Sequence, residues 1–141
     1  MKIFEDCIKE GLVKKSGKNR EISNSLVKLA DIRLGGIGKF TNATLKVESY
    51  YEIIKELLTA LLASEGYKSY SHECLISFAR DKFSGKFTGM QIELMDQLRI
   101  IRNDIVYRGA FVEGDFLNRN ESAILDVIKI LKSLLSNLEN E

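Results

Sequence analysis

Apolar residues recur at intervals of three and four along most of the chain, which is the spacing of helices that bury one side. This pattern predicts helices over about residues 2–14, 19–35, 42–65, 90–108 and two more. The fourth helix starts at residue 69 or 71 and runs to about 80, and the last starts at residue 118 or 120 and runs to 138. No stretch alternates apolar and polar residues for long enough to predict a strand. We therefore predict an all-α fold, an up-down helical bundle of four principal helices plus one or two short helices. It forms one domain over residues 1–141.

Glycines and short polar residues mark the ends of the predicted helices. Gly35, Gly66 and Gly109 each follow an apolar run, a position where glycine often ends a helix. Thr41 or Asn42 precedes the third helix and has a side chain suited to capping its first turn. The chain contains no proline, which is consistent with long uninterrupted helices.

The predicted core is built from the apolar stripes of these helices. The second helix is expected to bury a face that contains Ile22, Leu26 and Leu29. The last helix has the most regular stripe, with the spacing of a bundle seam. Its members are Ile124, Val127, Ile128, Leu131, Leu134, Leu135 and Leu138.

Composition narrows the possible functions. The 141 residues include 21 basic and 20 acidic side chains, for a net charge of +1. This excludes a strongly basic protein that binds nucleic acid through its overall charge, but it does not exclude a local basic patch. One His and two Cys cannot form a four-ligand His/Cys zinc site within one chain. We predict no metal and no cofactor. Any imidazole-based catalysis would have to use His72.

The two cysteines and the apolar segments bear on the cellular compartment. Cys7 and Cys74 are far apart and form no CxxC motif, so we interpret them as separate buried thiols. Charged residues interrupt the apolar positions of Met1–Leu12, unlike a signal peptide. No stretch has the roughly 20 apolar residues of a membrane span. We therefore expect a cytoplasmic protein without a membrane segment.

The fifth predicted helix carries the residues best suited to chemistry. At about 100° per residue, Arg99, Arg102, Asn103 and Tyr107 share one side of it, and Arg108 follows at its end. Guanidinium groups bind phosphate oxygens through paired N–H donors. An amide can bond a base or ribose, and a phenol can stack on a base. These residues are candidate RNA- or nucleotide-binding groups.

A structural interpretation of the same residues is also open. Arg99 and Arg102 could form salt bridges with Glu93, Asp96 or Asp104 on their own helix. The Asn103 amide could bond a neighbouring helix, and the Tyr107 ring could fill a gap at the surface. By residue type alone, this interpretation accounts for the motif at least as well as ligand binding does.

The run from Leu98 to Tyr107 resembles the signature of HEPN domains (higher eukaryotes and prokaryotes nucleotide-binding). That signature is an Arg, usually followed by a polar residue, with a His four to six residues after the Arg. Arg102 and Asn103 match its first two positions, and Tyr107 stands where the His is expected. The segment from Leu61 to Glu73 also resembles the end of the long helix and the following link in small prokaryotic HEPN proteins.

The resemblance implies an all-α homodimer in which two motif helices meet across a composite cleft. Many HEPN proteins are metal-independent endoribonucleases of toxin–antitoxin or defence systems, in which Arg and His support attack of the ribose 2′-hydroxyl on phosphate. It therefore implies Arg102, Asn103 and Tyr107 as catalytic positions if the chain is active. A phenol with a pKa near 10 is a poor base at neutral pH. The resemblance also implies a minimal nucleotidyltransferase as a possible partner.

His72 is the only imidazole that could compensate for the missing motif His. It lies near the start of the short fourth helix, where the helix dipole disfavours its charged form. Its alternative role is that of a partly exposed residue near a helix cap, or one bonded to Glu73. We favour a non-catalytic or weakly active RNA- or nucleotide-binding module that dimerises. The alternatives are an endoribonuclease with a modified active site and a purely structural helical dimer.

Overall fold

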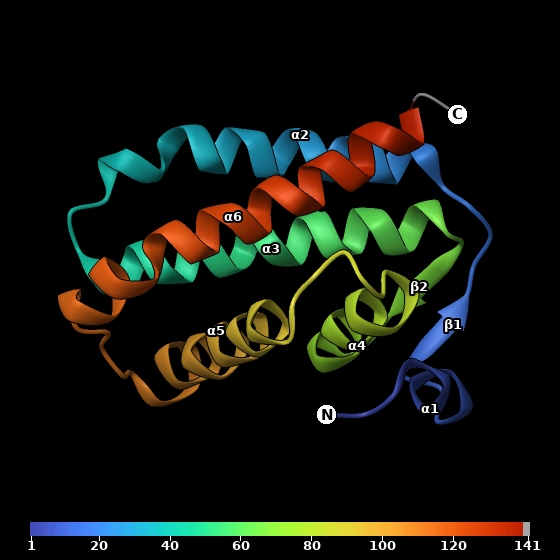
Figure 1. Cartoon of the computed structure of the whole chain (residues 1–141), viewed down its shortest axis with the longest axis horizontal. Coiled ribbons are helices and arrows are strands. Elements are labelled where there is room, and N and C mark those ends of the chain that lie inside the picture. Colours follow the sequence, from blue (N-terminus) through green and yellow to red (C-terminus); the bar gives the residue numbers. More distant parts are fainter. Residues whose placement is uncertain (140–141) are drawn as a thin grey trace.

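The computed structural model describes residues 1–139 of the chain, so residues 140–141 of the predicted domain lie outside the described part. It confirms a predominantly all-α fold (Figure 1). The elements are α1 (Phe4–Lys9), β1 (Val13–Lys15), α2 (Arg20–Gly36), the 3₁₀ turn η1 (Ile37–Lys39), α3 (Ala43–Ser64), β2 (Tyr67–Ser69), α4 (His72–Lys82), α5 (Gly89–Arg108) and α6 (Gly114–Glu139).

Helix α3 is the centre of the bundle, because α2, α4, α5 and α6 all pack against it. Thirteen of its 22 residues are buried, and they come from all of its sides. A helix that is apolar all round is expected in the interior of a bundle. The predicted seam of α6 packs on the same core: Ile124, Val127, Ile128, Leu131 and Leu135 are buried, and Leu134 and Leu138 lie at its edge.

The first turns of α2, α3, α4 and α5 are each capped by a side chain. The side chains of Asn19, Asn42 and Ser71 accept bonds from backbone N–H groups in the first turns of α2, α3 and α4. Thr88 and Gln91 form a reciprocal capping box at the start of α5. These caps confirm the predicted helix starts near residues 19, 42 and 71.

The predicted first helix extends too far toward the C-terminus. Its last residues belong to a β-ribbon that the sequence did not predict. Helix α1 ends at Lys9, because Gly11 turns the chain with φ 75°. The chain then forms β1, which pairs antiparallel with β2, with Lys14 opposite Lys68. Gly66 allows this pairing: its φ is 88°, and a Cβ there would lie 3.3 Å from the backbone of Gly17.

The expectation of two separate thiols is wrong. The sulfurs of Cys7 and Cys74 are bonded, with their Cα atoms 6.1 Å apart, and both residues are fully buried as predicted. Packing of α1 against α4 brings them together: Phe4 contacts the Phe78 ring at 5.2 Å between centroids, and its backbone N–H donates to Asp81 at 2.8 Å. The Cα separation is in the ordinary range for disulfides.

Two further predictions are wrong in detail. Ile22 and Leu29 of α2 are exposed, whereas Leu26 packs against the core and Ala30 is buried. The buried stripe of α2 is therefore rotated from the predicted one. Helix α6 begins at Gly114, about one turn before the predicted start near residue 118. Among residues 1–139, no helix has the length and apolar character needed to cross a bilayer.

Candidate functional site

Arg102 lies in a polar cluster that α3, α4 and α5 build together. Its side chain is 16% exposed, and its Nε lies 3.4 Å from a carboxylate oxygen of Glu52 on α3. That geometry does not make a hydrogen bond, so the buried Nε–H has no acceptor within the described residues. We name this set the Arg102 cluster; its members are Glu52, Lys55, His72, Asp96, Arg99 and Arg102.

The carboxylate of Glu52 links the cations of the cluster. Its Oε2 lies 2.6 Å from the Lys55 ammonium one turn along α3, while its Oε1 faces Arg102. Arg99 is held in a similar way by Asp96, at 2.8 Å on its own helix. The cluster thus has three cations and two carboxylates, all partly buried. Glu52 is shared by two of the cations, so the cluster has an excess of one positive charge.

His72, in the first turn of α4, lies close enough to this cluster for the charges of the cluster to act on its imidazole. Its ring lies 6.2 Å from the ring of buried Tyr51 on α3. Burial lowers the pKa of His72 below its usual 6.5, and the positive charges of Lys55 and Arg102 lower it further. His72 is therefore neutral near pH 7, with an imidazole nitrogen free to accept a proton. Burial also raises the pKa of the Tyr51 hydroxyl, which stays protonated.

The other predicted site residues fall into two groups. Asn103 is half-buried beside Arg102, whose Nη1 donates to the Asn103 amide oxygen over a long 3.4 Å. Tyr107 is 75% exposed at the end of α5, and Arg108 is 81% exposed with only a 3.8 Å contact to Asp104. The structure therefore brings Arg99, Arg102 and His72 together and leaves Tyr107 and Arg108 at the surface.

Sequence reasoning missed Glu52 and Lys55. Their spacing on the predicted third helix, three residues apart, indicates an ordinary surface ion pair. Both lie within the stretch whose apolar neighbours are almost all buried, which was the available signal that they are partly buried too. The structural interpretation of Arg99 was correct in part, since Asp96 pairs with it.

The arrangement has groups that could hold an anion. Arg102 has a buried N–H without a hydrogen-bond acceptor among the described residues, its carboxylate neighbour Glu52 is shared with the Lys55 ammonium, and Arg99 lies one turn before Arg102 on α5. Phosphate oxygens accept from such donors more strongly than neutral acceptors do. Within residues 1–139, no group of three or more His, Cys, Asp or Glu side chains is placed to hold a metal ion.

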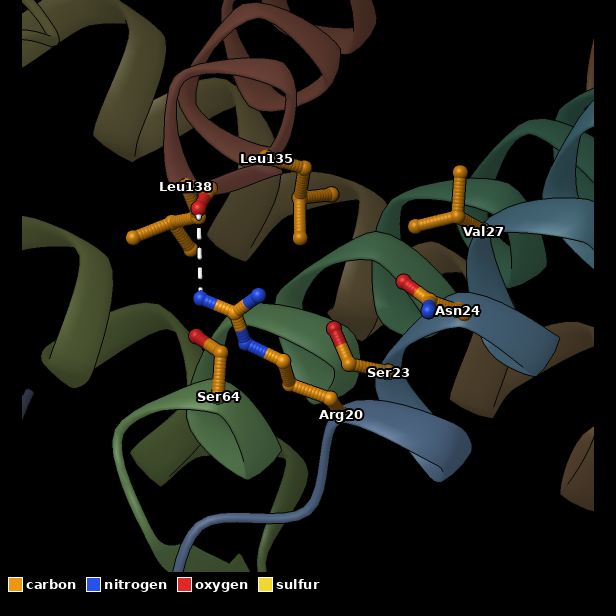
Figure 2. Close-up of a pocket in the computed structure, with 7 residues that line it drawn as sticks. All are labelled: Arg20, Ser23, Asn24, Val27, Ser64, Leu135 and Leu138. Carbon is orange, nitrogen blue, oxygen red and sulfur yellow. Dashed lines mark hydrogen bonds between the residues drawn. The ribbon is translucent and has the colours of Figure 1, made fainter. Parts of the chain in front are cut away.

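A separate hollow at the far end of the bundle has a structural role (Figure 2). It has a volume of about 180 Å³ and is lined by Arg20, Ser23 and Ser64 among others. Arg20 donates to the Leu138 carbonyl at 3.4 Å. This contact places a cation at the C-terminal end of α6, where carbonyl groups lack helical partners. The hollow is smaller than ordinary small-molecule sites.

No family model matches the chain, and no curated protein and no solved structure matches it either. The resemblance to HEPN domains therefore stays a prediction that rests on the motif residues. The fold and the Arg102 cluster stand on the structure alone.

Proposed function

We propose that this chain is a HEPN-like protein that binds RNA or a nucleotide, with the phosphate held in the Arg102 cluster. One observation carries the proposal: the buried Nε–H of Arg102 has no hydrogen-bond acceptor within the described residues. A buried donor without a partner costs about 1–3 kcal/mol of stability. A phosphate oxygen would accept that bond and would compete with Glu52 for the neighbouring cations.

The test is a thermal-shift titration of purified protein with a dinucleoside monophosphate. A ligand at about 100 times its Kd stabilises the folded state by about 2.7 kcal/mol, which is a rise in Tm of several degrees. Arg102→Gln should abolish the rise, because it removes the guanidinium. Arg119→Gln is the matched control, since Arg119 is exposed on α6 and bonds only a carbonyl of its own helix. An equal shift in both variants would refute the assignment.

A second candidate is a metal-independent endoribonuclease in which His72 replaces the motif His. The lowered pKa of His72 and the nearby Arg102 support it. Neutral His72 would take the proton of a ribose 2′-hydroxyl as that oxygen attacks the adjacent phosphorus. The bond between phosphorus and the 5′-oxygen would break, and the leaving oxygen would take a proton from water. The products would be a 2′,3′-cyclic phosphate and a strand with a 5′-hydroxyl. RNA incubated in EDTA should yield cyclic ends with the wild type and none with His72→Gln. Cleavage by that variant would exclude His72 as the base.

The same proposal includes a homodimer formed through the outer side of α5. Four apolar or aromatic side chains are exposed between residue 100 and the residues just after this helix, which is unusual for one short stretch of a bundle. They are Ile100, Val106, Tyr107 and Phe111. In such a dimer Tyr107 and Arg108 would lie near the interface. This would give Tyr107 a packing role in place of the catalytic role that the HEPN motif implies.

We further propose that the chain pairs with a minimal nucleotidyltransferase in a toxin–antitoxin system. This part rests on the HEPN resemblance. The neighbouring reading frame provides the direct check, because such pairs are encoded side by side. Co-expression should then give a complex on size-exclusion chromatography. A neighbouring frame of another kind, or no complex on co-expression, would contradict the pairing.

A further inference from the structure

A second group of cations lies on and beside the β-ribbon. Unlike the cations of the Arg102 cluster, these cations are not paired with carboxylates among residues 1–139. Lys14, Lys15, Lys18 and Lys68 are all exposed, and none of them has an acidic partner within the described residues. We name these lysines together with Tyr70 the ribbon patch. The whole chain has a net charge of only +1, so this is a local concentration of positive charge.

Two of the lysines are placed in an unfavourable position. Lys14 and Lys68 are direct partners across the antiparallel strands, and like charges in that relation destabilise a ribbon. Both strands are only three residues long. The repulsion therefore acts where few other contacts hold the strands together. An anion bound between the two ammonium groups would remove it.

An exposed aromatic ring lies beside the same two lysines. Tyr70 is 61% exposed, and its backbone N–H donates to Leu12 at 2.7 Å, which extends the ribbon by one step. The Lys14 and Lys68 ammonium groups lie 5.7 and 5.4 Å from the centre of its ring. Cations that follow a backbone beside an aromatic face are the elements of single-stranded nucleic-acid binding.

The ribbon patch adjoins the Arg102 cluster along the chain. Tyr70 precedes His72 by two residues, so their Cα atoms are at most about 7 Å apart. A strand whose phosphate lies at Arg102 would meet the ribbon next. A dinucleotide would be too short to use both places fully.

We propose that the ribbon patch is a second contact for single-stranded RNA, in which Tyr70 stacks on a base and Lys14 and Lys68 bind the flanking phosphates. The inference rests on the proposed function and extends it. It assigns the Arg102 cluster to one phosphate and the ribbon to the continuation of the same strand. A short RNA then contacts only the Arg102 cluster, and a longer RNA contacts both the Arg102 cluster and the ribbon patch.

The experiment compares two ligands by fluorescence anisotropy: a labelled RNA of about 12 nucleotides and a labelled dinucleotide. Tyr70→Ala should weaken the longer RNA about tenfold and leave the dinucleotide unchanged. Tyr70→Phe should bind the longer RNA like the wild type, because it keeps the ring.

Lys68→Gln should lower the slope of log affinity against log salt by about 0.7. Lys28 is an exposed lysine of α2, so Lys28→Gln should leave that slope unchanged.

Each result separates this inference from the proposed function. If Tyr70→Ala binds the longer RNA normally while Arg102→Gln loses both ligands, the ribbon contact is refuted and the Arg102 site stands. If Tyr70→Ala weakens the longer RNA while Arg102→Gln binds the dinucleotide normally, the ribbon contact stands and the Arg102 site falls. A wild type that binds neither RNA refutes both. Binding of phosphatidylserine vesicles that depends on Tyr70, without an effect on RNA, would identify the ribbon as a membrane contact and refute the inference.

Discussion

Helix α3 and the C-terminal half of α5 are both rich in apolar residues, and the structure uses them differently. In α3 the apolar residues are buried, and four helices pack around them. In α5 the last buried residue is Leu98, and the following turns carry half-buried or exposed side chains. Ile101 packs only at the edge of the core, and Ile105 is half-buried.

This difference separates the part of the bundle that packing stabilises from the part where we propose a binding site. The buried apolar residues of α3 are fixed by packing, whereas its partly buried Glu52 and Lys55 belong to the Arg102 cluster. The second half of α5 has no buried residue, and it contains Arg102 together with exposed apolar side chains. Elements with few buried contacts are where binding residues are commonly found.

The largest expected effect comes from the core of α3. Leu57 is fully buried, so Leu57→Ala should lower the free energy of unfolding by about 2–5 kcal/mol, through lost burial and a cavity. Urea denaturation followed by circular dichroism measures it. Leu45→Ala is the control on the same helix, because Leu45 is 48% exposed, and it should change stability by less than about 0.5 kcal/mol. Equal losses in the two variants would contradict the central role of α3.

The parts of the fold predicted correctly are those set by local patterns. The repeat of apolar residues located α2, α3 and α4, and Asn42, one of the two expected caps, starts α3. The β-ribbon could not be predicted in the same way. Each strand has three residues, too few to show alternation, and the pairing of Val13 with Ser69 joins distant parts of the chain. The Cys7–Cys74 bond depends on that same long-range packing of α1.

The candidate site was predicted in part for a similar reason. Arg99 and Arg102 stand out on one helix, because a motif on a single helix is visible in sequence. His72 was the only imidazole available, but only the folded chain places it near the same cluster. Glu52 and Lys55 lie on α3 and are not part of any sequence motif. Tyr107 matched a motif position, yet its side chain lies outside the cluster.

A smaller effect is expected from His72, which connects the two regions because it lies between α3 and α5. The groups around it are Glu52, Lys55, Arg99 and Arg102. Its pKa is lower in the folded chain than its usual 6.5, so the unfolded chain binds more protons below that pH. Stability should therefore fall as pH drops through 6.5 toward the folded pKa, and be unaffected by this group above it.

Melting temperatures of the wild type and His72→Gln between about pH 7.5 and 5 provide the measurement. The wild type should lose more stability over this range than the variant, because glutamine does not titrate. The carboxyl groups with lowered pKa, Asp81 and Glu121, titrate below this window and contribute equally to both proteins. Parallel curves would mean that His72 is not held neutral by the cluster. A bound dinucleotide should reduce the difference, because its phosphate favours the protonated imidazole.

The smallest effect on folding is expected at the exposed end of α5. Val106 is 48% exposed, so Val106→Ser should change the free energy of unfolding by less than about 0.5 kcal/mol at concentrations where the chain is monomeric. In the proposed homodimer the same side chain is buried by the partner. Light scattering at tens of micromolar protein should therefore give a dimer for the wild type and a lower mass for Val106→Ser. Leu125→Ser, at a comparably exposed position of α6 (41%), should leave the mass unchanged. A wild type that is monomeric would remove the dimer, and it would leave the apolar end of α5 as the part of the bundle that packing alone does not explain.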